Sequence, residues 1–293
     1  MDLLNYDVVD TPPRAAASVV LLRDGPQGLE VFLLRRHGMS EVLGGMYVFP
    51  GGKLDREDAD PDTLRHLDMP PDALHAALGE PDLDEATAAG FFVAACRETF
   101  EESGVLLARG VDASVAAAAT ALSREGYGFA ELLGRLGLVL SCTRVTPWSR
   151  WITPRVPSLM NKRFDVRFFA AVVPRDQVAV HDNREATESV WLTPRAAIEQ
   201  YWSGQIGIAP PQLMSLVELA RHTCVAEVVD PARRLWPRVV QPESVELETG
   251  RVTAYPGDEF HQLKVRVMPG PLRLVFRNKR FEPPGGGFEE FFA

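Results

Sequence analysis

The spacing of apolar and polar residues near the N-terminus predicts a β-hairpin. Two runs rich in apolar and β-branched residues, 16–23 and 29–36, flank the turn-forming segment 24–28, which is the pattern of two strands joined by a tight turn. A shorter apolar run at 46–49 ends at the sequence Pro-Gly-Gly, residues 50–52. Proline followed by two glycines predicts a turn whose backbone a ligand can approach closely.

Helical spacing dominates the stretch from Asp84 to Ser103. Its apolar positions recur every three or four residues, Asp84 is suited to cap the first turn, and Gly104 is suited to end the helix. The preceding segment, 55–85, is acidic and carries four prolines, which predicts a solvated insertion with one short helix near 74–78. The remaining pattern predicts helices at 113–136, 193–201 and 210–228 and strands at 139–146, 163–173 and 189–192.

The composition changes after Asp230. Residues 231–293 are rich in proline, glycine and β-forming residues, and they predict a small β-rich C-terminal region beside a larger region of helices and strands. A chain of 293 residues is long enough for this division, because a domain typically holds about 150 residues.

The composition and net charge of the chain limit the kinds of partner and the location that we expect. Hydrophobic residues make up 46% and charged residues 24% of the chain, which is ordinary for a soluble globular protein. There is no apolar run of about 18 residues and no signal-peptide pattern, so we expect no membrane span. The net charge of −9 disfavours nucleic-acid binding, which needs a basic surface. Cys96, Cys142 and Cys224 lack the spacing of a disulfide framework or a zinc site, so a cytoplasmic location is expected.

Three carboxylates in the predicted helix are the strongest candidates for chemistry. Glu98, Glu101 and Glu102 stand at positions i, i+3 and i+4 and therefore share one helix face. Arg97 lies four residues before Glu101, where it can brace that side chain. Crowded like charges repel, and a hard divalent cation such as Mg²⁺, which prefers oxygen ligands, relieves the repulsion. The alternative is a solvated acidic helix face, which is common.

These residues resemble the closing half of the Nudix hydrolase signature, GX5EX7REUXEEXGU, in which U is apolar. In the opening half, Gly52 matches the first glycine and Asp58 stands where the family has glutamate. Thirty-eight residues separate Asp58 from Arg97, against seven in the family pattern. An insertion of about 31 residues, at about 59–89, therefore splits this signature, which we call the Nudix box. The closing half is matched by Arg97, Glu98, Glu101, Glu102, Gly104 and Val105. Thr99 stands at a position that is usually apolar.

The split box resembles that of the Nudix subgroup that contains the peroxisomal coenzyme A diphosphatases. Segments 151–154 (WITP), 163–169 (RFDVRFF) and 209–212 (APPQ) also resemble that subgroup. The coenzyme A-associated motif LLTxR[SA]x3Rx3Gx3FPGG is matched in part, at Leu33, Arg36, Gly45 and 49–52. The resemblance covers roughly residues 14–229 and implies a domain of the α/β (α+β) class with the Nudix fold, a mixed β-sheet sandwiched between helices.

The resemblance also implies an activity, the metal-dependent hydrolysis of a pyrophosphate bond in a small nucleotide. Coenzyme A or acyl-coenzyme A is the first substrate candidate, and ADP-ribose or a dinucleotide is the second. Arg97, Glu98, Glu101 and Glu102 are the implied catalytic group. Mg²⁺ or Mn²⁺ would be held by the three glutamates and the Gly52 carbonyl, with Glu101 as ligand or general base. A non-catalytic Nudix-fold sensor is the competing class, which loss of the box glutamates would favour; all three are present.

Further residues are candidates for substrate binding. The arginine side chain suits phosphate, and Arg36, Arg163 and Arg167 flank the expected sheet, while Glu188 directly precedes an expected strand. Surface salt bridges and an exposed strand-edge glutamate are the alternatives for these four. We also expect residues 59–83 to line the substrate pocket, with a passive loop as the alternative, and the chain to form a homodimer.

Overall fold

The computed structural model describes residues 4–40, 43–182, 185–248 and 250–293, and its centre is a mixed β-sheet. The predicted hairpin is confirmed as β1 (Arg14–Gly25) and β2 (Gly28–Arg36), and β1 pairs in parallel with β6 (Phe164–Val172). The strand order is β3-β2-β1-β6-β5-β8, with β4 paired to β1 and β7 paired to β2. The other strands are β3 (Tyr47–Val48), β4 (Gly51–Lys53), β5 (Val145–Ile152), β7 (Ala186–Leu192) and β8 (Arg238–Val240).

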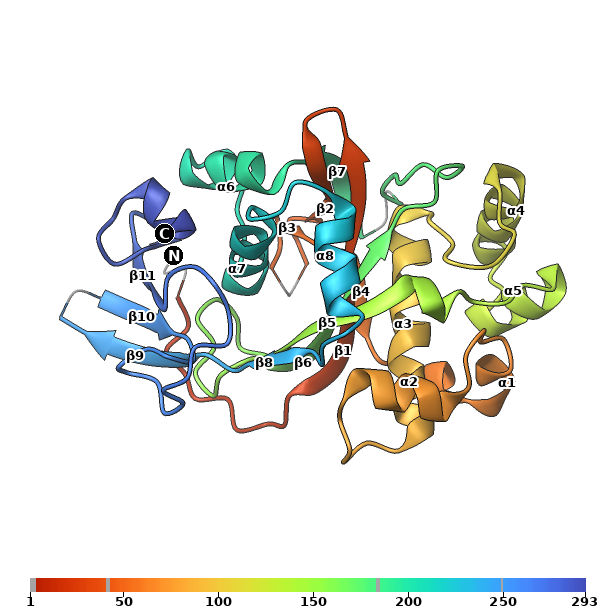
Figure 1. The fold of residues 1–293 in the computed structure, drawn as a ribbon, viewed down its shortest axis with the longest axis horizontal. Coiled ribbons are helices and arrows are strands. Elements are labelled where there is room, and N and C mark those ends of the chain that lie inside the picture. The colour runs from red at the N-terminus through yellow and green to blue at the C-terminus, as the bar shows by residue number, and fades with distance from the viewer. Residues whose placement is uncertain (1–3, 41–42, 183–184, 249) are drawn as a thin grey trace.

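Helices cover both faces of this sheet (Figure 1). Successive residues of β1 point to opposite faces, so Leu21 joins one buried cluster together with Phe92, and Leu22 joins a second cluster together with Leu213. The first face carries α1 (Pro61–Leu64), α2 (Pro71–Leu78), α3 (Glu85–Ser103), α4 (Ala113–Arg124) and α5 (Phe129–Leu136); the second carries α6 (Pro194–Trp202), α7 (Pro210–Leu219) and α8 (Val225–Ala232). This arrangement confirms the expected fold class.

The helix α3 begins and ends where the sequence predicts. The side chain of Asp84 accepts a hydrogen bond of 2.8 Å from the backbone N–H of Thr87, which satisfies a free donor of the first turn. Gly104 ends the helix with φ of 71°, a left-handed conformation that glycine adopts without strain. The Asp84 cap and the Gly104 stop thus define the ends of the helix that carries the three glutamates.

The segment before α3 is more ordered than predicted. Besides the short helix η1 (Arg56–Ala59) it contains α1 and α2, and Leu74 and Leu78 of α2 are fully buried in the first core cluster. The short helix expected near 74–78 is confirmed as α2, whereas the expectation that it is the one helix of a solvated insertion is wrong. The physical reason is that Leu74 and Leu78, four residues apart, form an apolar stripe that packs onto the sheet's helical layer.

Three other element boundaries differ from the predictions. The helix expected at 113–136 is divided into α4 and α5, with Gly126 at φ of 95° between them. The helix expected at 210–228 is likewise divided into α7 and α8. The strand expected at 139–146 lies later, as β5, and accommodates Pro147 at a register irregularity of the kind where a missing N–H is tolerated.

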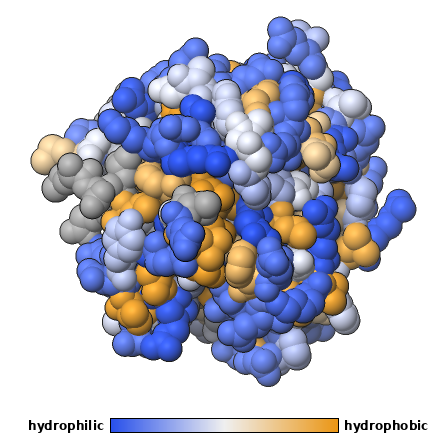
Figure 2. Space-filling model, turned by 90° about the vertical axis from the view of Figure 1, so that its left-hand side faces the viewer, coloured by the Kyte–Doolittle hydropathy of each residue, from blue (hydrophilic) through white to orange (hydrophobic). Residues whose placement is uncertain are grey.

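The C-terminal region is rich in strands, and it is not isolated from the rest. A four-stranded antiparallel sheet contains β9 (Glu243–Leu247), β10 (Gly250–Ala254), β11 (Arg273–Arg277) and β12 (Arg280–Glu282), followed by η3 (Phe288–Phe292). The strand β8 joins the central sheet, and Tyr255, Phe281 and Phe291 belong to the second core cluster. On the side that carries this sheet, hydrophobic patches lie between hydrophilic residues (Figure 2). A domain boundary near residue 230 stays a prediction.

Among the described residues, no helix is long and apolar enough to cross a membrane.

Candidate active site

The glycine turn and the carboxylates of α3 are in direct contact. The backbone N–H of Gly51 donates a hydrogen bond of 2.9 Å to Oε2 of Glu102. The Oε1 atom of Glu98 lies only 2.3 Å from where a Cβ on Gly52 would stand, so a side chain at position 52 would collide with that carboxylate. The backbone at 51–52 therefore lies directly against the carboxylates of the helix.

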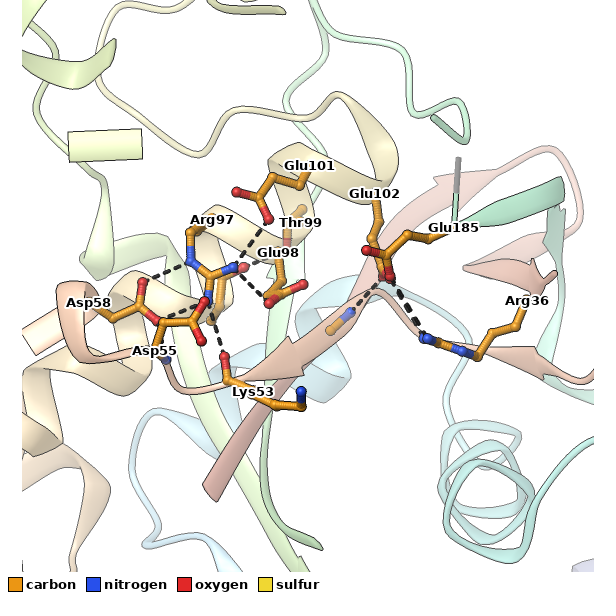
Figure 3. A network of polar contacts seen from close by, with 12 residues as sticks. Arg36, Lys53, Asp55, Asp58, Arg97, Glu98, Thr99, Glu101, Glu102 and Glu185 are labelled. Atoms are coloured by element: carbon orange, nitrogen blue, oxygen red, sulfur yellow. Dashed lines mark hydrogen bonds and ion pairs between the residues drawn. The ribbon is translucent and has the colours of Figure 1, made fainter. Parts of the chain in front are cut away.

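Arg97 links the two halves of the box (Figure 3). Its Nε and Nη2 donate hydrogen bonds of 2.8 Å each to the two oxygens of Asp58. Its Nη1 donates to Glu98 at 2.7 Å and to Glu101 at 3.1 Å, and Nη2 also donates to the carbonyl oxygen of Lys53 at 3.0 Å. The predicted brace between Arg97 and Glu101 is thus present, and it is one part of a larger network.

Asp58, at the position where the family pattern has glutamate, forms a buried ion pair with Arg97. Its side chain is 2% exposed and accepts both hydrogen bonds from Arg97. The neighbouring Ala59 packs on Gly90 of α3, where an added Cβ would be 3.1 Å from the Ala59 Cβ. The inserted segment therefore leaves and rejoins the box at nearby points, and the 38 intervening residues do not separate its two halves in space.

Burial shapes the electrostatics of the glutamates. Desolvation, assisted by the carboxylates of Glu101 and Glu185 and opposed by Arg97, raises the pKa of Glu98 to about 7. Desolvation also raises the pKa of Glu102 to about 8, although the hydrogen bond from Gly51 opposes it. Desolvation raises the pKa of Glu101 above its ordinary value as well. The site thus holds carboxylates whose ionised forms are destabilised until a cation approaches.

The same residues suit a divalent metal ion in their chemistry. Desolvated carboxylates and a carbonyl are the oxygen ligands that Mg²⁺ and Mn²⁺ prefer. Within the described ranges no three His, Cys, Asp or Glu side chains are grouped so that they could hold a metal ion. Arg97 pairs with Glu98 and Glu101, while the Gly51 N–H and Arg36 engage Glu102. The donor set fits a divalent ion that competes with these partners.

A cavity of about 510 Å³ opens beside this network, a size typical of small-molecule sites. Arg36 lines it, with Nη1 3.7 Å from Glu102 and Nη2 3.8 Å from Glu185, and its buried Nε has no hydrogen-bond partner among the described residues. The charged residues of the lining are Arg36, Lys53, Asp55, Arg97, Glu98, Glu101 and Glu185.

Comparison with known proteins decides the family. A family model described as the NUDT19 Nudix domain matches residues 11–219. The chain belongs to this Nudix family. A chain named acyl-coenzyme A diphosphatase NUDT19 from Xenopus laevis is 26% identical over 275 residues, which is 79% of this chain and 71% of that one. Its counterpart from Gallus gallus is 27% identical over 310 residues, covering 85% and 79%.

A solved Nudix structure supports the fold. The crystal structure of a Nudix hydrolase from Alicyclobacillus acidocaldarius has a TM-score of 0.59 and 26% identity, covering 78% of this chain and 98% of that one. As a Nudix family member the chain is a pyrophosphohydrolase. Nudix hydrolases generally use divalent metal ions.

The structure brings most of the predicted Nudix site residues together. Gly52, Arg97, Glu98, Glu101, Glu102 and Arg36 converge at the junction of β2, β4 and α3. Three others, Arg163, Arg167 and Glu188, are absent from the cavity lining found in the described residues. Their substrate-binding role therefore stays a prediction without structural support.

Each of the three has another partner. Arg167 follows Val166 on β6 and so points to the opposite face of the sheet, where it pairs with Glu80 and lies over the ring of Phe91. The Nε of Arg163 donates to the carbonyl of Thr153 at 3.1 Å. Glu188 is 3.5 Å from Nη1 of Arg35 on the neighbouring strand.

Sequence reasoning missed several residues of the site. Lys53, Asp55 and Glu185 line the cavity, and Asp58 holds Arg97. Lys53 directly follows the glycine turn and Asp58 occupies a position of the Nudix box. The sequence position of both residues could therefore have identified them as site candidates. No lining residue within the described part of the chain comes from 59–83, which leaves the predicted pocket-lining role of the insertion without support.

Proposed function

We propose that this Nudix hydrolase cleaves the pyrophosphate bond of coenzyme A or acyl-coenzyme A, releasing 3′,5′-ADP and 4′-phosphopantetheine or its acyl derivative. The proposal is supported by the printed activity of the relatives, acyl-coenzyme A diphosphatase. The observation that carries it is a cavity that borders Glu98 and Glu101 of α3 and extends along a largely uncharged wall. Such a cavity suits a substrate with one highly charged part and one uncharged part.

In this proposal Glu98, Glu101, Glu102 and the Gly52 carbonyl hold Mg²⁺ or Mn²⁺. A bound ion supplies polarisation of the phosphoryl oxygens and acidification of a water molecule. Glu101, whose side chain is 44% exposed, serves as a ligand or accepts the proton of the attacking water.

The cations of the site have distinct roles. Arg97 positions Glu98 and Glu101 through its hydrogen bonds. Arg36 and Lys53, which line the cavity, neutralise the phosphates, because guanidinium and ammonium groups pair well with them.

The test is hydrolysis of a defined panel. The protein with Mg²⁺ is incubated separately with coenzyme A, acetyl-coenzyme A, ADP-ribose, NADH and Ap4A, and products are identified by mass. We expect 3′,5′-ADP from both coenzyme A substrates and a loss of product in Glu102→Gln but not in the control Glu131→Gln, which alters an exposed pair with Arg135. Cleavage of ADP-ribose or a dinucleotide, with coenzyme A intact, would support the second candidate instead.

A cytoplasmic location, a homodimer and the absence of nucleic-acid binding stay predictions.

A further inference from the structure

The cavity has a wall without charge. The lining residues from 151 onward, apart from Glu185, are all uncharged. They come from the end of β5, the loop at 153–160, the start of β6, the beginning of α7 and two residues of the C-terminal region. We call these residues the uncharged wall: Trp151, Ile152, Thr153, Pro154, Pro157, Ser158, Leu159, Met160, Phe164, Val166, Phe168, Ala209, Pro210, Pro211, Gln212, Pro242 and Thr253.

The sheet register separates this wall from the charged residues. Lys53 of β4 pairs with Ala16, Ala16 pairs with Val166, and Val166 pairs with Trp151. Neighbouring strands lie about 4.8 Å apart, so three steps place Trp151 about 14 Å from Lys53. A ligand that spans the cavity therefore meets charge at one end and the uncharged wall at the other.

One side chain in the wall lacks a partner. Gln212 is 9% exposed, and its Oε1 is buried with no hydrogen-bond partner among the described residues. It stands at the beginning of α7 directly after Pro210 and Pro211, which have no N–H to offer a ligand. A buried carbonyl oxygen without a donor is unfavourable, so a ligand N–H at this point is favoured.

The wall also depends on the C-terminal region. The Oγ of Ser244 donates a 2.7 Å hydrogen bond to the carbonyl of Val156, and Ser158 lies within 3.4 Å of the Thr253 hydroxyl. These contacts hold the loop at 153–160, and Thr253 itself lines the cavity. Since the Nudix family match ends at residue 219, part of the wall comes from outside the matched domain.

We propose that the uncharged wall binds the pantetheine arm of the substrate and that Gln212 accepts a hydrogen bond from an amide N–H of that arm. This rests on the proposed function. Of the two halves of coenzyme A, the nucleotide half carries the 3′-phosphate, and burying that phosphate beside a wall without a cation is costly. The pantetheine half carries two amides and no charge, which matches the wall.

The experiment measures binding of each half separately by calorimetry. The full chain and its Gln212→Met variant are titrated with 4′-phosphopantetheine and with 3′,5′-ADP. We expect the Kd for 4′-phosphopantetheine to rise about tenfold and that for 3′,5′-ADP to stay within twofold, with KM for coenzyme A rising in parallel. The control is Gln205→Met, which changes an exposed glutamine in the turn after α6.

A second variant guards against misfolding. Leu159→Trp adds bulk to the wall while position 212 keeps its glutamine, and it is expected to weaken 4′-phosphopantetheine binding similarly. Weakened binding of 3′,5′-ADP alone would assign the wall to the adenine half and overturn the proposal, as would unchanged binding of both ligands in both variants. Binding of the two halves is measured without turnover. Failure to hydrolyse coenzyme A would therefore refute the proposed function, whereas the binding data test the role of the wall independently.

Discussion

Replacing Asp58 by asparagine removes a negative charge from the most buried ion pair of the box. Asp58 is 2% exposed and Arg97 is 10% exposed, and the pair shares two hydrogen bonds of 2.8 Å. In Asp58→Asn one carboxylate oxygen becomes an NH₂ group that faces the N–H donors of Arg97, so one hydrogen bond is lost and two donors confront each other.

The magnitude follows from what Arg97 retains. Breaking a buried ion pair by removing one partner costs about 3–5 kcal/mol. Arg97 keeps Glu98, Glu101 and the Lys53 carbonyl, so we expect the lower end, about 3 kcal/mol. The slope of the free energy of unfolding against urea is about 3 kcal/mol per molar for a large domain, so the midpoint should fall by about 1 M.

Urea unfolding of metal-free protein, followed by circular dichroism, measures this shift. The matched control is Asp62→Asn in the same segment, where Asp62 pairs with Arg65 at 3.2 Å but is 83% exposed. Exposed pairs contribute about 0–1 kcal/mol, so the control should hardly move. A midpoint for Asp58→Asn as close to wild type as that of the control would refute the inference that Asp58 anchors Arg97.

Four further predictions concern the metal, the glutamates and the insertion. Mg²⁺ or Mn²⁺ should raise the melting temperature by mass action, and EDTA should abolish hydrolysis; activity in excess chelator would contradict the metal proposal. Glu102→Gln should lower kcat on the order of 10²-fold or more, measured by product formation, and a folded, fully active variant would exclude Glu102 as a ligand. Because the pKa values of Glu98 and Glu102 are raised to about 7 and about 8, the folded state binds more protons than the unfolded state between pH 5 and 8. Metal-free protein should therefore lose stability as pH rises through that window, with Mg²⁺ opposing the loss; melting temperatures that rise with pH would contradict this sign. Replacing residues 59–83 with a Gly/Ser linker should lower the melting temperature, because Leu74 and Leu78 leave the core, and unchanged stability would show that the insertion is passive.

Local patterns in the sequence predicted the helix α3, which carries the three glutamates, well. The Asp84 cap, the Gly104 stop and the i, i+3, i+4 spacing of the glutamates are all short-range signals. The hairpin of β1 and β2 is similarly local. These features needed no knowledge of the rest of the chain.

Features that depend on distant residues were not accessible in the same way. Whether Arg167 faces the cavity depends on the register of β6 against β1, and a shift of one position reverses the face of every side chain. The pairing of Glu80 with Arg167 joins residues 87 positions apart. The contribution of Thr253 to the cavity depends on how the C-terminal sheet docks, which no local period specifies.

The parallel pairing of β1 with β6 has a consequence for synthesis of the chain. Arg14 is paired with Phe164, 150 residues later, and translation adds roughly 5–20 residues per second. The edge of β1 that β6 will cover is thus without its partner for about 8–30 s, although the strand carries the apolar run Val19–Leu22. An open apolar strand edge is a site for association with other chains, so nascent copies on one polysome are most vulnerable to mispairing during this interval, and slower elongation at low temperature lengthens it.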